Sequence, residues 1–194
     1  MRPFILAATI LCLPAAVYAQ KPIPAAQQIA LAVLPLPKVF RADATVLGYD
    51  ARGTLVTLRR GTGAMVCLMS DPKQATFDPA CYQNSLEPFM ARGRELRAQG
   101  TTGAKVDSVR FAEIKSGKLP MPKQAAALYA LDGPMSGVNA AAGTVTAAIK
   151  PRYVVYMPYA TSASTGLPDE PIATGPWLME PGTPKAHIMF TPSM

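Results

Sequence analysis

The sequence predicts an α+β fold, in which an antiparallel β-meander and a C-terminal hairpin pack with two or three helices around one disulfide. Three observations predict it. Short segments rich in β-branched and aliphatic residues alternate with turn residues. Amphipathic segments follow in the middle of the chain. Two cysteines remain once an N-terminal export segment is set aside. We expect a single domain over residues 20–194, long enough to bury a hydrophobic core.

The first 19 residues have the three parts of a secretory signal peptide. A positive charge at Arg2 precedes an apolar run over residues 4–17, and the small residue Ala19 suits a signal peptidase. Pro14 interrupts the run, which is shorter than the roughly 20 residues that span a bilayer. We therefore expect cleavage after Ala19 and a protein that works in the bacterial periplasm or outside the cell, without spanning a membrane.

Cysteine use fits export. Cleavage removes Cys12 and leaves Cys67 and Cys81 in an oxidising compartment, where we expect them to form a disulfide. Closing this loop would stabilise the fold by about 3 kcal/mol in the chain-entropy model. The spacing is neither that of a Cys-x-x-Cys redox pair nor that of a zinc site, so we expect no metal and no cofactor.

The formal net charge is +7, and the basic residues are scattered, with Arg59-Arg60 as the adjacent pair. They form either a solvated surface or one that attracts anionic lipid, cell-wall polymer or an acidic ligand. Nucleic acid is not expected as a partner, because no basic stripe with interleaved aromatic residues is present. An envelope component or a small molecule fits better.

The N-terminal half of the expected domain begins with residues 20–40, which are rich in proline and alanine. They form either a short helix over 25–34, ended by Pro35, or a loose arm. Turn residues at 50–53 and 61–63 then predict two consecutive hairpins, and hence the antiparallel meander. Its three strands are expected over residues 45–49, 54–59 and 64–69.

The middle of the chain predicts a loop and two helices. Residues 71–83 are polar and interrupted by proline, so they form a loop tied back through Cys81. The first helix has Ser85 as its N-cap and Gly100 beyond its end. The second helix covers 105–116 and ends at Gly117. One face of the first helix carries its apolar residues, namely Leu86, Phe89, Met90, Gly93 and Leu96.

The C-terminal part predicts strands again. The run Tyr153-Val154-Val155-Tyr156 has the composition of a buried strand. A loop over 160–175 is too long to be a simple connector. A hairpin closes the chain, with strands at 177–179 and 186–190 around a type II turn at 180–183. The other two strands are expected over residues 126–131 and 143–150, with the strand that contains the tyrosines extending over 152–158.

This C-terminal part also carries a resemblance. Gly175-Pro176-Trp177-Leu178-Met179, followed by Gly182-Thr183-Pro184 and Ala186-His187-Ile188-Met189, resembles the tail of a family of exported bacterial proteins without an established activity. The resemblance extends upstream through Tyr153–Tyr156 and the hairpin at Gly48-Tyr49-Asp50. It implies export and a single domain, and it transfers no catalytic residue.

His187 is the one histidine of the sequence and the first candidate for a functional role. Strand alternation places it on one face with Met189, and Ala186, Ile188 and Phe190 on the other. If the second face is the core, His187 points to solvent or into a cleft; otherwise it has a structural role. A binding site would lie under the 160–175 loop. Its aromatic contacts would come from Trp177, Tyr156 and Tyr159 beside His187.

Two chemical alternatives involve the same histidine. A hydrolase would use His187 as base, Ser164, or its neighbours Ser162 and Thr165, as nucleophile, and Asp169 to orient the ring. No Gly-x-Ser-x-Gly motif supports it. A copper site would add Met157, Met179 and Met189 to His187, but no Met-x-x-Met cluster is present. We therefore expect a non-enzymatic binding or envelope-associated module, with the small periplasmic hydrolase as the alternative.

Overall fold

One large, mostly antiparallel β-sheet organises the chain in the computed structural model, which describes residues 23–173 and 175–191. The expected signal peptide, residues 1–19, lies outside the described residues. The strands of this sheet are β1 (Thr45–Tyr49), β2 (Leu55–Arg59), β3 (Met65–Leu68), β4 (Thr76–Phe77), β5 (Ala80–Gln83), β6 (Ala126–Pro134), β9 (Lys150–Tyr156), β10 (Trp177–Met179) and β11 (His187–Phe190). Their order is β10-β11-β9-β6-β5-β3-β1-β2, and β4 pairs with the end of β6.

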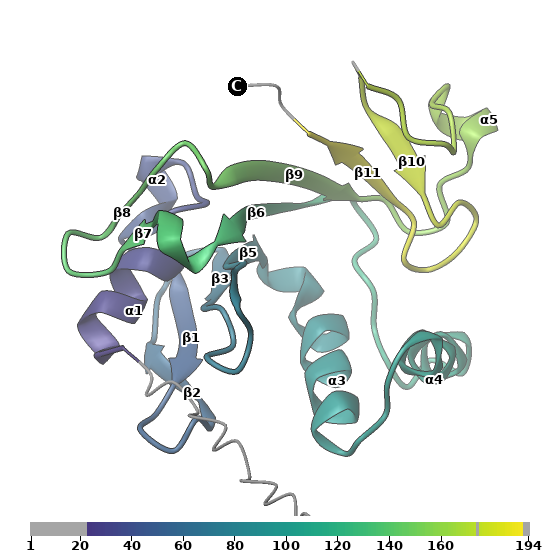
Figure 1. Ribbon diagram of the computed structural model, residues 1–194. Helices are drawn as coiled ribbons and strands as arrows, with labels where there is room; N and C mark the ends of the chain where they lie inside the picture. Colours follow the sequence, from purple (N-terminus) through teal and green to yellow (C-terminus); the bar gives the residue numbers. More distant parts are fainter. Residues whose placement is uncertain (1–22, 174, 192–194) are drawn as a thin grey trace, which may run out of the picture.

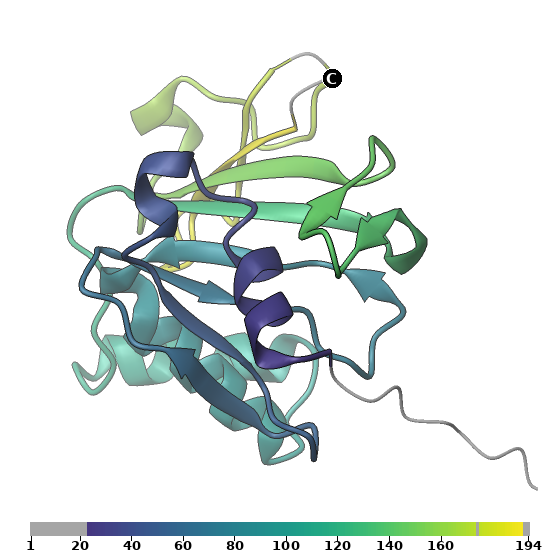
Figure 2. The same cartoon turned by 90° about the vertical axis from the view of Figure 1, so that its left-hand side faces the viewer.

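The helices lie on both faces of this sheet (Figures 1 and 2). Helices α1 and α2 lie on one face and α3 and α4 on the other, while α5 lies beyond β10. This arrangement confirms the predicted α+β class with one disulfide. The helices are α1 (Ala25–Ala32), α2 (Lys38–Arg41), α3 (Glu87–Ala98), α4 (Ala104–Lys115) and α5 (Ser162–Thr165), with 3-10 turns at Asn84–Leu86 and Met135–Gly137; β7 (Val138–Asn139) and β8 (Thr144–Val145) form a separate hairpin.

The segment before β1 is packed, so the helix predicted there is confirmed and the loose arm is wrong for its described residues. Leu31 and Leu36 are fully buried against the sheet. The amide of the buried Gln28 binds both the N–H and the carbonyl oxygen of Tyr49, each at 2.8 Å, and so fastens α1 to β1. Gly48 leaves the room for this contact, because a Cβ there would lie 2.6 Å from the Gln28 Oε1 atom.

The expected meander is only half correct. Strands β1 and β2 form the predicted hairpin, but β3 lies on the other side of β1 and pairs with it in parallel. The loop between β2 and β3 therefore crosses the start of β1. A Cβ on Gly61 would lie 2.1 Å from the Asp43 carbonyl oxygen, so the glycine allows the crossing. The sequence pattern identified the strands but not which neighbour β3 would choose.

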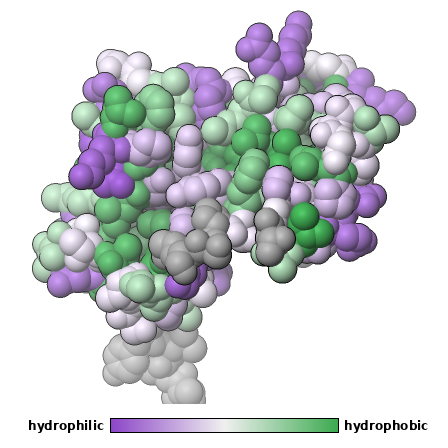
Figure 3. Space-filling view, turned by 90° about the horizontal axis from the view of Figure 1, so that it is seen from above, coloured by the Kyte–Doolittle hydropathy of each residue, from purple (hydrophilic) through white to green (hydrophobic). Residues whose placement is uncertain are grey.

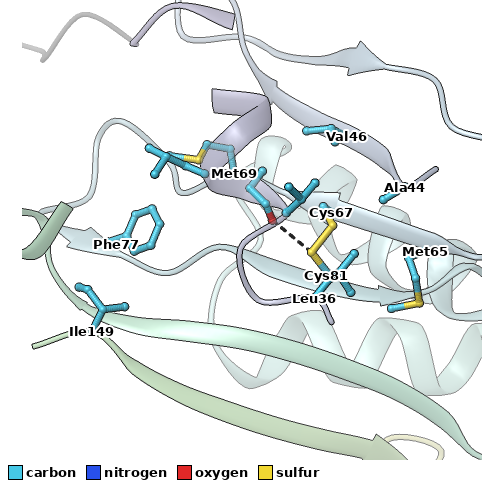
Figure 4. Close-up of a cluster of buried hydrophobic side chains, with 12 residues drawn as sticks. Leu36, Ala44, Val46, Met65, Cys67, Met69, Phe77, Cys81 and Ile149 are labelled. Atoms are coloured by element: carbon cyan, nitrogen blue, oxygen red, sulfur yellow. Dashed lines mark hydrogen bonds between the residues drawn. A yellow bond between two sulfur atoms is a disulfide. The ribbon is translucent and has the colours of Figure 1, made fainter. Parts of the chain in front are cut away.

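The predicted disulfide is present, and its neighbourhood corrects the loop expected at 71–83. Residues Ala80–Gln83 form β5, which pairs antiparallel with β3 so that Cys67 and Cys81 face each other directly. Both cysteines are fully buried in the cluster under α1 (Figure 4). The Cys81 Sγ atom lies 3.1 Å from the Ala32 carbonyl oxygen. This is a packing contact, since a disulfide sulfur carries no hydrogen to donate.

Helices α3 and α4 form where predicted, and Gly100 and Gly117 follow their ends with positive φ angles of 86° and 76°. The expected N-cap is wrong. Ser85 lies inside a 3-10 turn that precedes α3, and the side chain of Gln83 accepts the Ser85 N–H at 2.7 Å. The predicted apolar face is buried at Leu86, Phe89, Gly93 and Leu96: Leu86 and Phe89 belong to the cluster with strand residues, and Gly93 lies next to Arg110 of α4.

The C-terminal hairpin of β10 and β11 is confirmed, with Gly182 at φ 73° in its turn. The strand expected at 143–150 is wrong, because its pairing is limited to Thr144–Val145 in β8 and the chain then turns toward Lys150. Of the two faces left open for residues 186–190, the core is the one that carries His187. His187 and Met189 are buried on the α3–α4 side of the sheet, whereas Phe190 is exposed on the other face. Ala186 is buried in a small cluster with Leu178.

Candidate functional site

His187 is buried, with 7 % of its surface exposed. Its ring stacks on Tyr156 of the neighbouring strand, with 5.2 Å between the ring centroids and an interplanar angle of 28°. The Nδ1 atom lies 2.7 Å from the carbonyl oxygen of Lys185, which can only accept, so Nδ1 carries the proton. Burial is the largest influence on the ring and holds the pKa of His187 below its usual value of 6.5. His187 is therefore a neutral, structurally held imidazole at neutral pH.

A charged network joins the hairpin to helix α4 beside this histidine. The Nζ atom of Lys185 lies 2.9 Å from Asp107, whose other carboxylate oxygen accepts a hydrogen bond from Arg110. Arg110 is almost fully buried, lies 3.7 Å above the Phe89 ring and donates to the Phe89 carbonyl oxygen. Burial alone would raise the pKa of Asp107, but the hydrogen bonds from Lys185 and Arg110 hold it below its usual range. This network fixes where the hairpin lies against α4.

The residues of the hydrolase alternative are not connected. Ser164 lies in α5, where its hydroxyl accepts from the Thr161 N–H at 2.9 Å and donates to the Thr161 carbonyl oxygen at 3.0 Å. Asp169 is exposed in the following loop. Among the described residues, no hydrogen bond joins either side chain to His187, whose Nδ1 meets a backbone carbonyl where a triad would place a carboxylate.

The predicted aromatic contacts are divided between the interior and the surface. Tyr156 and Trp177 are buried on the α3–α4 side with His187. The indole N–H of Trp177 has no hydrogen-bond partner among the described residues. Tyr159 is 56 % exposed and adopts a positive φ of 65°, held by a hydrogen bond from its N–H to Thr183. The tail of the chain thus brings three of the four residues together as core and leaves Tyr159 outside.

The open part of the sheet lies on the opposite face, over β9 and β11. Tyr153 is 39 % exposed and is the direct cross-strand partner of Phe190, which is 36 % exposed. On its other side Tyr153 makes an edge-to-face contact with Tyr129, with 5.8 Å between centroids. Tyr129 in turn packs against the buried cluster that contains Leu36. Apolar contact therefore continues from the core under α1 to Phe190.

Helix α2 follows Leu36 and lies on the same side of the sheet. Its Val39 is 75 % exposed and its Phe40 is 45 % exposed. We call Val39, Phe40, Tyr153 and Phe190 the apolar surface. Figure 3 shows hydrophobic residues in the middle of the face seen from above and others at its left-hand side, with hydrophilic residues between them.

Sequence reasoning missed these four residues. It assigned Tyr153 to a buried strand and left residues 38–41 without a role. The available signal was the pair Val39-Phe40, placed between Lys38 and Arg41 in a segment too short for a core helix.

A separate small pocket of about 360 Å³ is lined by both polar and apolar residues. Because it lies at the start of α3, on the far side of the sheet from the apolar surface, it is not part of that surface. It is lined by Gln83, Ser85, Pro122, Lys123, Gln124 and Ala125.

Within residues 23–173 and 175–191, no three His, Cys, Asp or Glu side chains come together as a metal site. In the same ranges no helix has the length and apolar character that crossing a membrane requires. The fold and its surfaces define an α+β protein with a buried aromatic–histidine core and an open apolar sheet face. Comparison of the chain with protein-family models, curated proteins and solved structures finds no match.

Proposed function

We propose that the protein is an exported, non-enzymatic binding module that associates with a component of the bacterial cell envelope through the apolar surface. The observation that carries the proposal is the placement of the exposed large hydrophobic residues. Within the described residues they lie on α2 or from β9 onward, and none lies on α3 or α4. The full set is Val39, Phe40, Tyr153, Tyr159, Ile172, Met179 and Phe190. Two pairs among them are neighbours, Val39 with Phe40 on α2 and Tyr153 with its cross-strand partner Phe190, and grouped exposed apolar residues mark interaction surfaces, whereas singly scattered ones do not.

Export supports an envelope partner. The N-terminal segment has the pattern of a signal peptide, and the tail resembles that of exported bacterial proteins. The disulfide between Cys67 and Cys81 suits an oxidising compartment. A positively charged protein in that compartment attracts anionic lipids and polymers.

A binding role also agrees with the chemistry of the tail. His187 is buried, and its Nδ1–H donates a hydrogen bond to a backbone carbonyl oxygen. The Ser164 hydroxyl accepts a hydrogen bond from the Thr161 N–H in the N-terminal cap of α5. The hydrolase alternative needs these two side chains to meet. No contact among the described residues favours it, and we put forward binding alone.

Cell fractionation tests the proposal. The full chain, made in a Gram-negative host with its own N-terminus, should be cut after Ala19 and recovered in the envelope fraction. A variant carrying Phe40→Ser and Phe190→Ser should move to the soluble periplasmic fraction. The paired control Tyr159→Ser with Ile172→Ser should stay in the envelope. Recovery of the wild type as an uncut cytoplasmic protein, or entirely in the soluble periplasm, would overturn the proposal.

A further inference from the structure

Helix α2 presents two adjacent apolar side chains to solvent on a single turn. Val39 and Phe40 are 75 % and 45 % exposed, and the preceding Pro37 is exposed as well. Side chains of this kind gain free energy when they leave water, and a single turn is too small to bury them against itself. They are therefore placed to leave water, either by inserting into an apolar phase or by packing against a binding partner.

The turn is held rigidly in this position. The guanidinium of Arg41 donates to the carbonyl oxygens of Leu34 and Leu36, both at 2.8 Å, and Leu36 is anchored in the core. Arg59 of β2 donates to the carbonyl oxygen of Arg41 at 2.6 Å. Because the backbone of α2 is fixed from two directions, Val39 and Phe40 need no rearrangement to make a contact.

Basic side chains surround the two apolar ones. Lys38 and Arg41 belong to α2 itself, Arg59 touches its end, and Arg60 follows as an exposed residue. Within the described part of the chain none of the four forms an ion pair with a carboxylate. Asp43 is the acidic side chain on the same segment. With four basic side chains and one acidic one, the net charge around Val39 and Phe40 is therefore positive.

We propose that α2 is the membrane-contact element of the protein and that its partner is a bilayer containing anionic phospholipid. Val39 and Phe40 enter the interfacial layer, while Lys38 and Arg60 meet lipid phosphates from the rim. Apolar insertion combined with basic contacts is how peripheral elements bind anionic bilayers. The inference rests on the proposed envelope association, and it names lipid as the component that is bound.

Vesicle sedimentation tests it. The exported full chain is mixed with vesicles of phosphatidylcholine alone or of phosphatidylcholine with phosphatidylglycerol. We expect binding to the anionic vesicles, weakened by salt, and little binding to the neutral ones. Phe40→Ser should lower the affinity about tenfold, and Lys38→Gln with Arg60→Gln about fivefold per residue.

Matched controls separate the surface from general effects. Ile172 is exposed to nearly the same extent as Phe40, so Ile172→Ser should bind like the wild type. Lys115→Gln with Lys123→Gln changes the net charge equally and should also leave binding nearly unchanged. Circular dichroism checks that each variant is folded.

Three results would overturn the inference: no binding of the wild type to anionic vesicles, equal binding by Phe40→Ser, or a Phe40→Ser effect confined to self-association in size-exclusion chromatography. If the first occurred while fractionation still placed the protein in the envelope, the proposed function would stand with a partner other than lipid.

Discussion

The imidazole of His187 stacks on the ring of Tyr156 across two neighbouring strands, inside the interior of the protein. The Nδ1–H of His187 donates a hydrogen bond to the backbone carbonyl oxygen of Lys185, whose side chain binds Asp107 of α4. Besides the pairing of β11 with β9, the C-terminal hairpin is thus held by the stack on Tyr156 and by the ion pair with α4, which lie close together. Several consequences of this junction are measurable.

Stability should fall in mild acid because of His187. Burial lowers its folded pKa below the usual 6.5, so the folded state favours the neutral ring. The stabilisation is present above about pH 6.5, where the unfolded chain is neutral too, and is lost as the pH falls toward the folded pKa. The charged groups facing the ring are Lys185, Glu180 and Arg152. The lowered pKa of Asp107 acts only at lower pH, since a carboxylate normally titrates near 4.

Urea denaturation at pH 7.5 and pH 5.5 measures this effect. The wild type should be less stable at the lower pH, and His187→Phe, which keeps an aromatic ring in the stack, should lose most of that difference. An equal pH dependence in both proteins would contradict the assignment.

Asp107→Asn should destabilise the protein by about 2 kcal/mol, because it weakens charge-assisted hydrogen bonds to Lys185 and to the buried Arg110. The matched control is Asp169→Asn in the exposed loop, which should change stability by less than about 0.5 kcal/mol. A double-mutant cycle with Lys185→Met isolates the pair. Fully additive effects would show that Asp107 and Lys185 do not interact in solution.

The disulfide should contribute about 3 kcal/mol to the free energy of unfolding. Cys67→Ala with Cys81→Ala leaves two small apolar residues in the buried cluster and should lower the unfolding midpoint. Reduction of the wild type with dithiothreitol should lower it in the same direction. Two free thiols in the oxidised, folded protein would contradict the bond.

Gly61→Ala should destabilise the crossing between β2 and β3 by about 3 kcal/mol, since a Cβ there meets the backbone of Asp43 and Ala44. The adjacent exposed Thr62→Ala should be nearly neutral. In a simple meander residue 61 would face solvent, so a neutral Gly61→Ala would argue for antiparallel pairing of β3 with β2.

The local sequence pattern predicted where strands and helices lie better than it predicted which strands pair with each other. The lengths of β1, β2 and α4 follow from alternation, turn residues and helix-ending glycines, which act within a few residues. The pairing of β3 with β1 depends on how closely the loop at Gly61 approaches Asp43, a contact between distant residues that no local pattern encodes. The strand at Ala80–Gln83 was missed because prolines and polar residues around it suggested a loop.

The candidate site shows the same limit. Alternation correctly put His187 and Met189 on one face, but which face is buried depends on α3 and α4, which cover that side of the sheet. Tyr153 was assigned to a buried strand because its composition is apolar, while the cover over its outer face is incomplete. Exposure of a residue is set by what packs above it, and for the apolar surface only the three-dimensional arrangement reveals this.

In-cell photocrosslinking tests envelope association through the apolar surface most directly. A photoreactive phenylalanine analogue is placed at Phe40, at Phe190 or, as a control, at Ile172 in the full chain expressed with its own N-terminus, and the cells are irradiated before fractionation. We predict adducts with envelope material at positions 40 and 190 and few at 172. Absence of adducts at positions 40 and 190, or equal yields at all three positions, would contradict the account.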